Sequence, residues 1–225
     1  MGRNQEKDAI EMAAKNQRIL EKGFAIFAEK GIDNVTMTDV AKAAGIGIAS
    51  LYRYYSTKPE LVLAIGTWAW KGYFEEQIMK TEEAEPSIKC AAESVDLFLE
   101  SFLDLYRNHK DLLRFNHFFN VYVLSGTVPS ERIRSYNTLV GSLEERFAGI
   151  YRRGQEDGTL RSDVSEEVMF STMMHLMLSA VSRYAAGLVY FNRETNEEEE
   201  LKTQKQMLLS RFCTTKTDKT EEERA

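Results

Sequence analysis

The 225-residue sequence is poor in the residues that interrupt helices, with only three prolines and thirteen glycines. It also lacks any run of alternating apolar and polar residues bounded by turns, which is the pattern of a half-buried β-strand. Its abundant Ala, Leu, Glu, Lys and Met favour helix instead. The chain is long enough to bury a core without disulfides or metals, and we predict an all-α protein with two domains and about nine helices.

Cysteine and histidine are scarce. Cys90 and Cys213 lack a second pair, so neither a disulfide framework nor a metal knot is expected, and we expect idle thiols in a reducing cytosol. None of the three histidines has a carboxylate or histidine partner three or four positions away, which disfavours a metal site on a helix. The most apolar run, Met173 to Val181, is too short to span a bilayer. We therefore expect a cytoplasmic protein with no membrane partner, no metal and no cofactor.

Basic residues are fewer than acidic ones, 29 Lys and Arg against 35 Asp and Glu, so the net charge is −6. This argues against a protein that coats nucleic acid indiscriminately, because such binding depends on neutralising many phosphates. Residues 1–62 hold nine Lys/Arg against eight Asp/Glu, a net charge of about +1, so the remainder carries about −7. A nearly neutral amino end on an acidic body suits a protein that touches DNA at one end only.

Two short helices around a glycine are predicted between Thr36 and Lys58, after an amphipathic helix over 10–30. Thr36 and Asp39 fit a capping box, in which the hydroxyl accepts the N–H of residue 39 and the carboxylate reaches back. Gly45 is expected to end the first of the two helices in the left-handed conformation that glycine tolerates. The residues predicted to face inward are Val40, Ala41, Ala44, Ile46, Leu51 and Tyr55.

The second helix of this pair, predicted over about 47–55, exposes small residues. Gly47, Ile48, Ala49 and Ser50 would let the backbone approach base edges in a major groove. There Ser50 can hydrogen-bond a base edge, while Ile48 and Ala49 can pack on thymine methyl groups. The pattern predicts a DNA-reading helix.

Flanking side chains extend this surface. Arg53 can reach guanine or a phosphate, and Thr38 of the preceding helix can join it. Tyr52 and Tyr54 cannot both face the core, so at least one hydroxyl should face a phosphate. Lys58 lies in the first turn of the next helix, where the dipole disfavours a cation unless an anion is near. Its ammonium and the free N–H groups of that turn therefore predict a phosphate site.

The matched residues are Gly45-Ile46, Ser50-Leu51-Tyr52, Tyr54-Tyr55 and Lys58. Through them the first 65 or so residues resemble the TetR family of bacterial regulators. The resemblance assigns groove reading to Thr38, Ile48, Ala49, Ser50 and Tyr52, and backbone contacts to Tyr54 and Lys58. Gly47, Ile48 and Tyr55 depart from the family pattern, which leaves the operator sequence open. The predicted DNA-binding residues are Thr36, Thr38, Gly47, Ile48, Ala49, Ser50, Tyr52, Arg53, Tyr54 and Lys58.

The resemblance implies a helix-turn-helix DNA-binding domain over 1–57 and a larger ligand-binding and dimerisation domain over 58–213, while the polar composition of 214–225 predicts a disordered tail. The implied partners are a double-stranded operator, a small hydrophobic effector, and a second copy of the chain paired through the last two helices. The helices of the larger domain are predicted at about 58–80, 87–108, 110–125, 129–156, 165–190 and 196–213, with a loose acidic break at 81–86.

Aromatic and methionine side chains are frequent in the larger domain. Each alone is more often core than ligand wall, but together they favour an apolar or aromatic ligand, because such side chains line most pockets. The predicted pocket residues are Trp68, Phe98, Phe102, Phe115, Phe118, Phe119, Tyr122, Met173, Met174, Met177 and Tyr184.

We expect a ligand-responsive regulator, most simply a repressor, rather than an enzyme. The alternative is an all-helical carboxylate-bridged metal enzyme, which would need two Glu-x-x-His pairs that the sequence does not contain. No phosphate loop or nucleophile elbow is present either. The segment 45–50 resembles a dinucleotide loop, but no strand precedes it. A helical hairpin without DNA-binding function is the remaining interpretation of residues 36–58.

Overall fold

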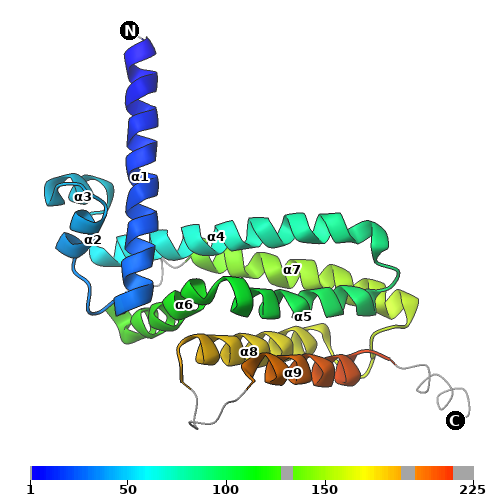
Figure 1. The fold of residues 1–225 in the computed structure, drawn as a ribbon. Helices are drawn as coiled ribbons and strands as arrows, with labels where there is room; N and C mark the ends of the chain where they lie inside the picture. Colours follow the sequence, from blue (N-terminus) through cyan, green and yellow to red (C-terminus); the bar gives the residue numbers. More distant parts are fainter. Residues whose placement is uncertain (1, 128–133, 189–195, 215–225) are drawn as a thin grey trace, which may run out of the picture. The chain divides into compact units, whose positions relative to one another are not determined.

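The computed structural model describes residues 2–127, 134–188 and 196–214. Within these ranges the chain forms nine α-helices and no β-strand, which confirms the predicted fold class (Figure 1). The elements are α1 Gly2–Lys30, α2 Met37–Ala43, α3 Ile48–Tyr54, α4 Lys58–Ala84, the 3-10 helix η1 Glu85–Ser87, α5 Ala91–Asn108, α6 Lys110–Tyr122, the π-helical turn η2 Val123–Thr127, α7 Arg134–Asp157, α8 Glu166–Ala185 and α9 Glu197–Phe212.

Several predicted boundaries are wrong. Helix α1 begins at Gly2 rather than near residue 10, and α8 ends at Ala185 rather than near residue 190. The loose break expected at 81–86 is helix up to Ala84, and within this helix Thr81 donates its hydroxyl to the Gln77 carbonyl at 2.8 Å. The predicted start at Pro129 and the tail after residue 214 lie outside the described residues.

Backbone contacts divide the chain into two compact units. The first unit comprises Met1–Tyr73 and Arg114–Leu139, and the second comprises Phe74–Leu113 and Val140–Ala225. Compactness therefore groups α6 with the amino-terminal helices, whereas the predicted domains 1–57 and 58–213 separate them. The predicted domains were defined by function, DNA binding for one and ligand binding with dimerisation for the other, and this assignment stays a prediction.

The first unit has a single core to which α1, α2, α3, α4 and α6 contribute. Close helix packing depends on Gly23 of α1, where a Cβ would lie only 2.5 Å from Ile65 Cδ1 of α4. Gly66 plays the same part toward α6, since a Cβ there would lie 2.8 Å from Phe119 Cε2. The large side chains fully buried in this core include Ile19, Phe27, Leu51, Leu61, Ile65, Phe115 and Phe119.

In the second unit α5 packs against α8 and α9. Phe98 of α5 contacts Phe147 of α7 and Phe170 of α8, with ring centroids 5.6 and 6.2 Å apart. The last residue of α7 caps the start of α5, because Asp157 Oδ2 accepts the Ala91 N–H at 2.8 Å. This carboxylate supplies the cap that α5 lacks from its own N-cap side chain.

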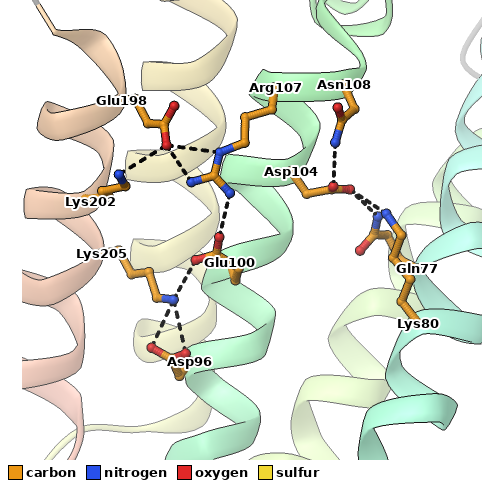
Figure 2. Close-up of polar contacts among 10 residues, drawn as sticks. All are labelled: Gln77, Lys80, Asp96, Glu100, Asp104, Arg107, Asn108, Glu198, Lys202 and Lys205. Atoms are coloured by element: carbon orange, nitrogen blue, oxygen red, sulfur yellow. Dashed lines mark hydrogen bonds and ion pairs between the residues drawn. The ribbon is translucent and has the colours of Figure 1, made fainter.

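Ion pairs join α5 to α9 (Figure 2). Arg107 lies between Glu198 of α9 and Glu100 of α5, at 2.7 and 2.8 Å. Lys205 of α9 bonds Glu100 at 2.7 Å and Asp96 at 3.0 Å, and its side chain is only 13% exposed. The partial burial makes the Lys205 contacts the more significant, because exposed pairs contribute little to stability.

Cys90 and Cys213 are free and half-buried. Burial, reinforced by the neighbouring Cys90, raises the pKa of Cys213 to about 11, so this thiol stays protonated at neutral pH.

Across the described ranges, no helix has both the length and the apolar character needed to cross a membrane.

Replacing Thr36 by Ala should lower the free energy of unfolding by about 1 kcal/mol, because the Asp39 N–H loses its acceptor and the capping box is broken. Urea unfolding of the full chain measures this. Thr38→Ala, two residues further on and exposed, is the matched control and should change stability much less. Equal destabilisation by the two substitutions would contradict a specific cap.

Glu100 should make the protein sensitive to acid. Partial burial alone would raise its pKa, but bonds from Lys205 and Arg107 outweigh this and lower it. A carboxylate with a lowered folded pKa stabilises above its unfolded pKa of about 4.3, and the contribution is lost as pH falls further. Glu100→Gln should therefore lower the Tm near neutral pH, with a difference from wild type that shrinks on acidification. The exposed Glu83→Gln is the control, and a constant Glu100→Gln difference would oppose this assignment.

Candidate nucleic-acid interface

The turn between α2 and α3 follows from its glycine. Gly45 has φ +66°, in the left-handed region, and its N–H donates to the Lys42 carbonyl at 3.1 Å. The Ile46 N–H donates to the Ala41 carbonyl at 3.0 Å, so both bonds of a Schellman motif are present. The predicted glycine turn is confirmed, and it directs the chain into α3.

The start of α2 is also as predicted. Thr36 Oγ1 accepts the Asp39 N–H at 3.2 Å, and Asp39 Oδ2 accepts the Thr36 N–H at 2.9 Å. The hydroxyl and backbone of Thr36 lower the pKa of Asp39, which keeps the carboxylate ionised for the cap. The observed role of Thr36 is therefore structural, as the N-cap of α2. Thr38 is exposed on α2 and takes no part in the cap.

The inward face of α3 is fixed by two residues. Leu51 is fully buried and Tyr55 is 8% exposed, as predicted from their spacing. Tyr55 also donates its hydroxyl to Asn16 Oδ1 of α1 at 2.7 Å, and burial raises the pKa of that hydroxyl. Because this face is taken, the opposite face of α3 has to point away from the core.

The outward face carries the residues predicted to read DNA. Gly47, Ile48 and Ala49 are exposed, and Ser50 is half-exposed. A Cβ on Gly47 would meet nothing within 4 Å, so the approach to the start of α3 is open. Tyr52 is 50% exposed and Arg53 is also exposed on this side. The structure thus groups the predicted reading residues on one open surface of the first unit.

Tyr54 and Lys58 have contacts within the first unit that the sequence did not reveal. The Tyr54 hydroxyl donates to the Met12 carbonyl of α1 at 3.4 Å. Lys58 Nζ lies 5.7 Å from the ring centroid of Tyr122, and burial lowers its pKa although Asp33 opposes the shift. Their phosphate contacts stay predictions.

The first turn of α4 offers fewer N–H groups than predicted. Thr57 Oγ1 accepts the Glu60 N–H at 3.4 Å, and Glu60 Oε2 accepts the Ser56 N–H at 2.9 Å. A carboxylate of the chain already occupies part of the anion-favouring end of this helix. A phosphate site here would therefore rely mainly on the Lys58 ammonium.

The predicted pocket residues separate into two groups. Those of the first unit lie in or against its core, with Phe115 and Phe119 stacked at 5.6 Å and Trp68 edge-on to Phe24 at 6.0 Å. Phe118 is half-buried beside Gly31, and Tyr122 is buried. The second-unit group is Phe98, Phe102, Met173, Met174, Met177 and Tyr184.

Within the second-unit group, Met173 and Met177 are fully buried and Phe102 nearly so, while Met174 is half-buried. The Phe98 and Phe102 rings lie edge to face at 5.5 Å. Tyr184 donates its hydroxyl to Glu200 of α9, and its partial burial beside this carboxylate raises its pKa to about 12. The second-unit group therefore consists of mostly buried apolar side chains and one tyrosine whose hydroxyl is bonded to α9.

Comparison with known proteins agrees with this geometry. Residues 19–65 match the family model for bacterial regulatory proteins of the tetR family, and residues 92–210 match the model for a tetracyclin repressor-like C-terminal domain. The HTH-type transcriptional repressor KstR2 of Rhodococcus jostii (strain RHA1) is 25% identical over 181 residues, which cover 80% of this chain and 84% of that protein.

Solved structures share the fold at low identity. The ketosteroid transcriptional regulator KstR2 of Mycobacterium tuberculosis superposes with a TM-score of 0.64 at 16% identity, covering 90% of this chain and 96% of that one. FadR from Bacillus subtilis, solved in complex with stearoyl-CoA, has a TM-score of 0.68 at 15% identity, covering 87% and 98%.

In this helical fold, α2 and α3 are joined by a turn at Gly45, and α3 has an exposed outer face. This arrangement defines a helix-turn-helix DNA-binding transcriptional regulator. The two matched models together account for most of the sequence. The chain belongs to the TetR family of bacterial regulatory proteins.

Lys58→Ala should weaken binding to every duplex and reduce the slope of log K against log salt by about 1, because the predicted phosphate contact would be lost. Ser50→Ala should leave this slope unchanged but alter which base is preferred at one position. Fluorescence-anisotropy isotherms at several salt concentrations measure both, with Lys89→Ala of the second unit as the control. Unchanged affinity of the Lys58 variant at low salt would remove this residue from the interface.

Proposed function

We propose that the protein is a ligand-responsive repressor that binds a palindromic operator as a homodimer and is released by a small apolar or aromatic ligand. The observation that carries this proposal is the outward face of α3, where small and aromatic residues stay exposed on a helix whose other face is clamped to the core. Small side chains there let the backbone approach base edges, and Ile48 and Tyr52 add apolar surface that thymine methyl groups and sugars can cover.

In this proposal residues 1–57 read the operator. Ile48, Ala49 and Ser50 approach base edges, Tyr52 and Arg53 extend the contact, and Thr38 joins from α2. Tyr54 and Lys58 hold the phosphate backbone and thereby set the position of α3. Base contacts then select the sequence, whereas the backbone contacts supply affinity that does not depend on it.

Dimerisation is assigned to α8 and α9, within residues 58–213. Met169, Met173 and Met177 form the buried face of α8, and Val168 and Leu176 lie on its outer side, each 53% exposed. Val168 and Leu176 are eight residues apart, and exposed apolar side chains at this spacing on a helix support pairing with a second copy. Two identical heads would then read two half-sites related by a two-fold axis, which is why we propose a palindrome.

The ligand is assigned to the apolar interior of the second unit, around Phe98, Phe102 and the α8 methionines. Methionine side chains adapt their shape, so this interior can open around an apolar group more easily than a core of branched residues. The relatives support such a ligand, since FadR from Bacillus subtilis was solved with stearoyl-CoA and KstR2 is named a ketosteroid regulator. Tyr184 would supply a polar group for orientation.

Release from DNA requires that the ligand bind one conformation better than the other. A ligand with equal affinity for the DNA-bound and free forms would shift nothing, however tightly it bound. By linkage, operator DNA must then weaken ligand binding by the same factor as ligand weakens operator binding.

The test begins with selection of duplexes from a randomised pool by the full-length protein, followed by footprinting of the enriched sequence. We expect a palindrome protected over two half-sites. Failure to enrich any duplex would end the proposal at its first step, and an enriched site without two-fold symmetry would refute the dimer.

Stearoyl-CoA, a free long-chain fatty acid and a steroid acid are then titrated against the operator complex. At least one should weaken operator binding by about fivefold or more, the usual lower range of allosteric coupling. Phe102→Ala should reduce this response while leaving operator affinity without ligand unchanged, because Phe102 lies far from the outward face of α3 in sequence and in a different unit. Operator affinity that is indifferent to all three classes would contradict an apolar effector.

A further inference from the structure

Three side chains of the kinds that bind metals meet in the second unit. Glu76 comes from α4, Asp104 from α5, and His109 is the residue between α5 and α6. One ligand atom from each can be chosen so that all lie within 4.8 Å of one another, and Glu76 Oε2 is 3.4 Å from His109 Nε2. Spacing of three or four residues within one helix could not reveal this cluster, because Glu76 comes from another helix and His109 follows Asp104 by five residues.

The two carboxylates already attract a cation. Lys80 Nζ lies 2.8 Å from Glu76 Oε1 and 2.9 Å from Asp104 Oδ2, and Figure 2 shows Lys80 and Gln77 converging on Asp104. One ammonium cannot neutralise two carboxylates, so a single negative charge is left over among these three groups. A divalent cation in the same place would balance both carboxylates.

Asp104 is held in one orientation by donors that do not belong to the proposed ligand set. Asn108 Nδ2 donates to Oδ1 at 2.8 Å, while Gln77 Nε2 donates to Oδ2 at 2.9 Å. Hydrogen bonds of this kind orient the ligands of metal sites.

Lys80 is the member of the cluster most able to leave. Its side chain is 44% exposed, against 22% for Asp104 and 27% for His109, and its flexible stem can carry the ammonium into solvent. His109 Nε2 is itself buried from solvent and faces the two carboxylates. Exchange of the ammonium for a metal ion would therefore need a rotamer change of Lys80 and a closer approach of the three ligand side chains.

We propose that Glu76, Asp104 and His109 form a binding site for a divalent transition-metal ion of the zinc type, which displaces the Lys80 ammonium. One imidazole nitrogen with two carboxylate oxygens is a donor set suited to Zn²⁺ and its neighbours, whereas Mg²⁺ and Ca²⁺ take oxygen ligands. Three protein ligands leave a further coordination position for water. The proposal rests on these three side chains and not on the proposed function.

Because Lys80 would compete with the metal ion, the proposal predicts weaker metal binding when a ligand is removed and tighter metal binding when Lys80 is removed. The full-length protein is first stripped with a chelator and then titrated with Zn²⁺ by calorimetry and with Co²⁺ by visible absorption. Wild type should bind one ion per chain. Asp104→Asn and His109→Gln should each weaken binding by about tenfold or more, because each removes a ligand. Lys80→Met should bind several-fold more tightly than wild type, since the competing cation is gone.

Matched controls separate this site from general surface binding. Asp96→Asn removes another α5 carboxylate that bonds a lysine, and His175→Gln removes an exposed histidine of α8. Both should bind the ion as wild type does. Zn²⁺ should also raise the Tm of wild type and Lys80→Met but not that of His109→Gln, because only binding to the folded site stabilises it.

Weaker or unchanged zinc affinity in Lys80→Met would overturn the proposal, and so would wild-type affinity in His109→Gln. If Asp104→Asn fails to fold by circular dichroism, Lys80→Met still decides, because it removes no ligand. Equal binding by wild type, all site variants and both controls would show adventitious adsorption, and the cluster would then be only an ion-pair network.

Discussion

The orientation of α3 depends on one packing constraint, the burial of Leu51 and Tyr55 against the first-unit core. A helix of seven residues is too short to be stable alone, so tertiary contact has to hold it. Its inward residues are four positions apart, and they leave no freedom in which face is presented outward. The Schellman turn at Gly45 and the Tyr55 bond to Asn16 fix the two ends of this arrangement.

In the second unit α5 has the corresponding role. Its apolar face contacts α8 through Phe98, while its charged residues pair with α9 through Glu100 and Arg107 and with α4 through Asp104. The apolar contacts provide most of the stabilisation, and the ion pairs favour one register between neighbouring helices. Among the residues that the structure describes, the carboxylates on the α4 side of α5 have an imidazole beside them, and those that pair with α9 have lysine and arginine.

Caps and turns with specific residue spacing were predicted correctly from the sequence, whereas contacts between distant segments and several helix boundaries were not. The Thr36–Asp39 cap and the Gly45 turn depend on residues within five positions of each other, so spacing was sufficient to predict them. The Tyr54 bond to Met12 joins residues 42 apart, and only the folded chain reveals it. The acidic stretch 81–84 was misjudged because composition alone suggested a loop, although each residue there tolerates a helix.

Ile48 and Tyr52 leave apolar surface in contact with water on the outward side of α3. Docking on thymine methyls and sugar carbons would remove that surface from solvent, and burial of apolar area has a calorimetric signature that phosphate contacts do not share, a negative change in heat capacity. The enthalpy of association with the correct duplex should therefore become steadily more favourable on warming, whereas association with an unrelated duplex should vary much less with temperature.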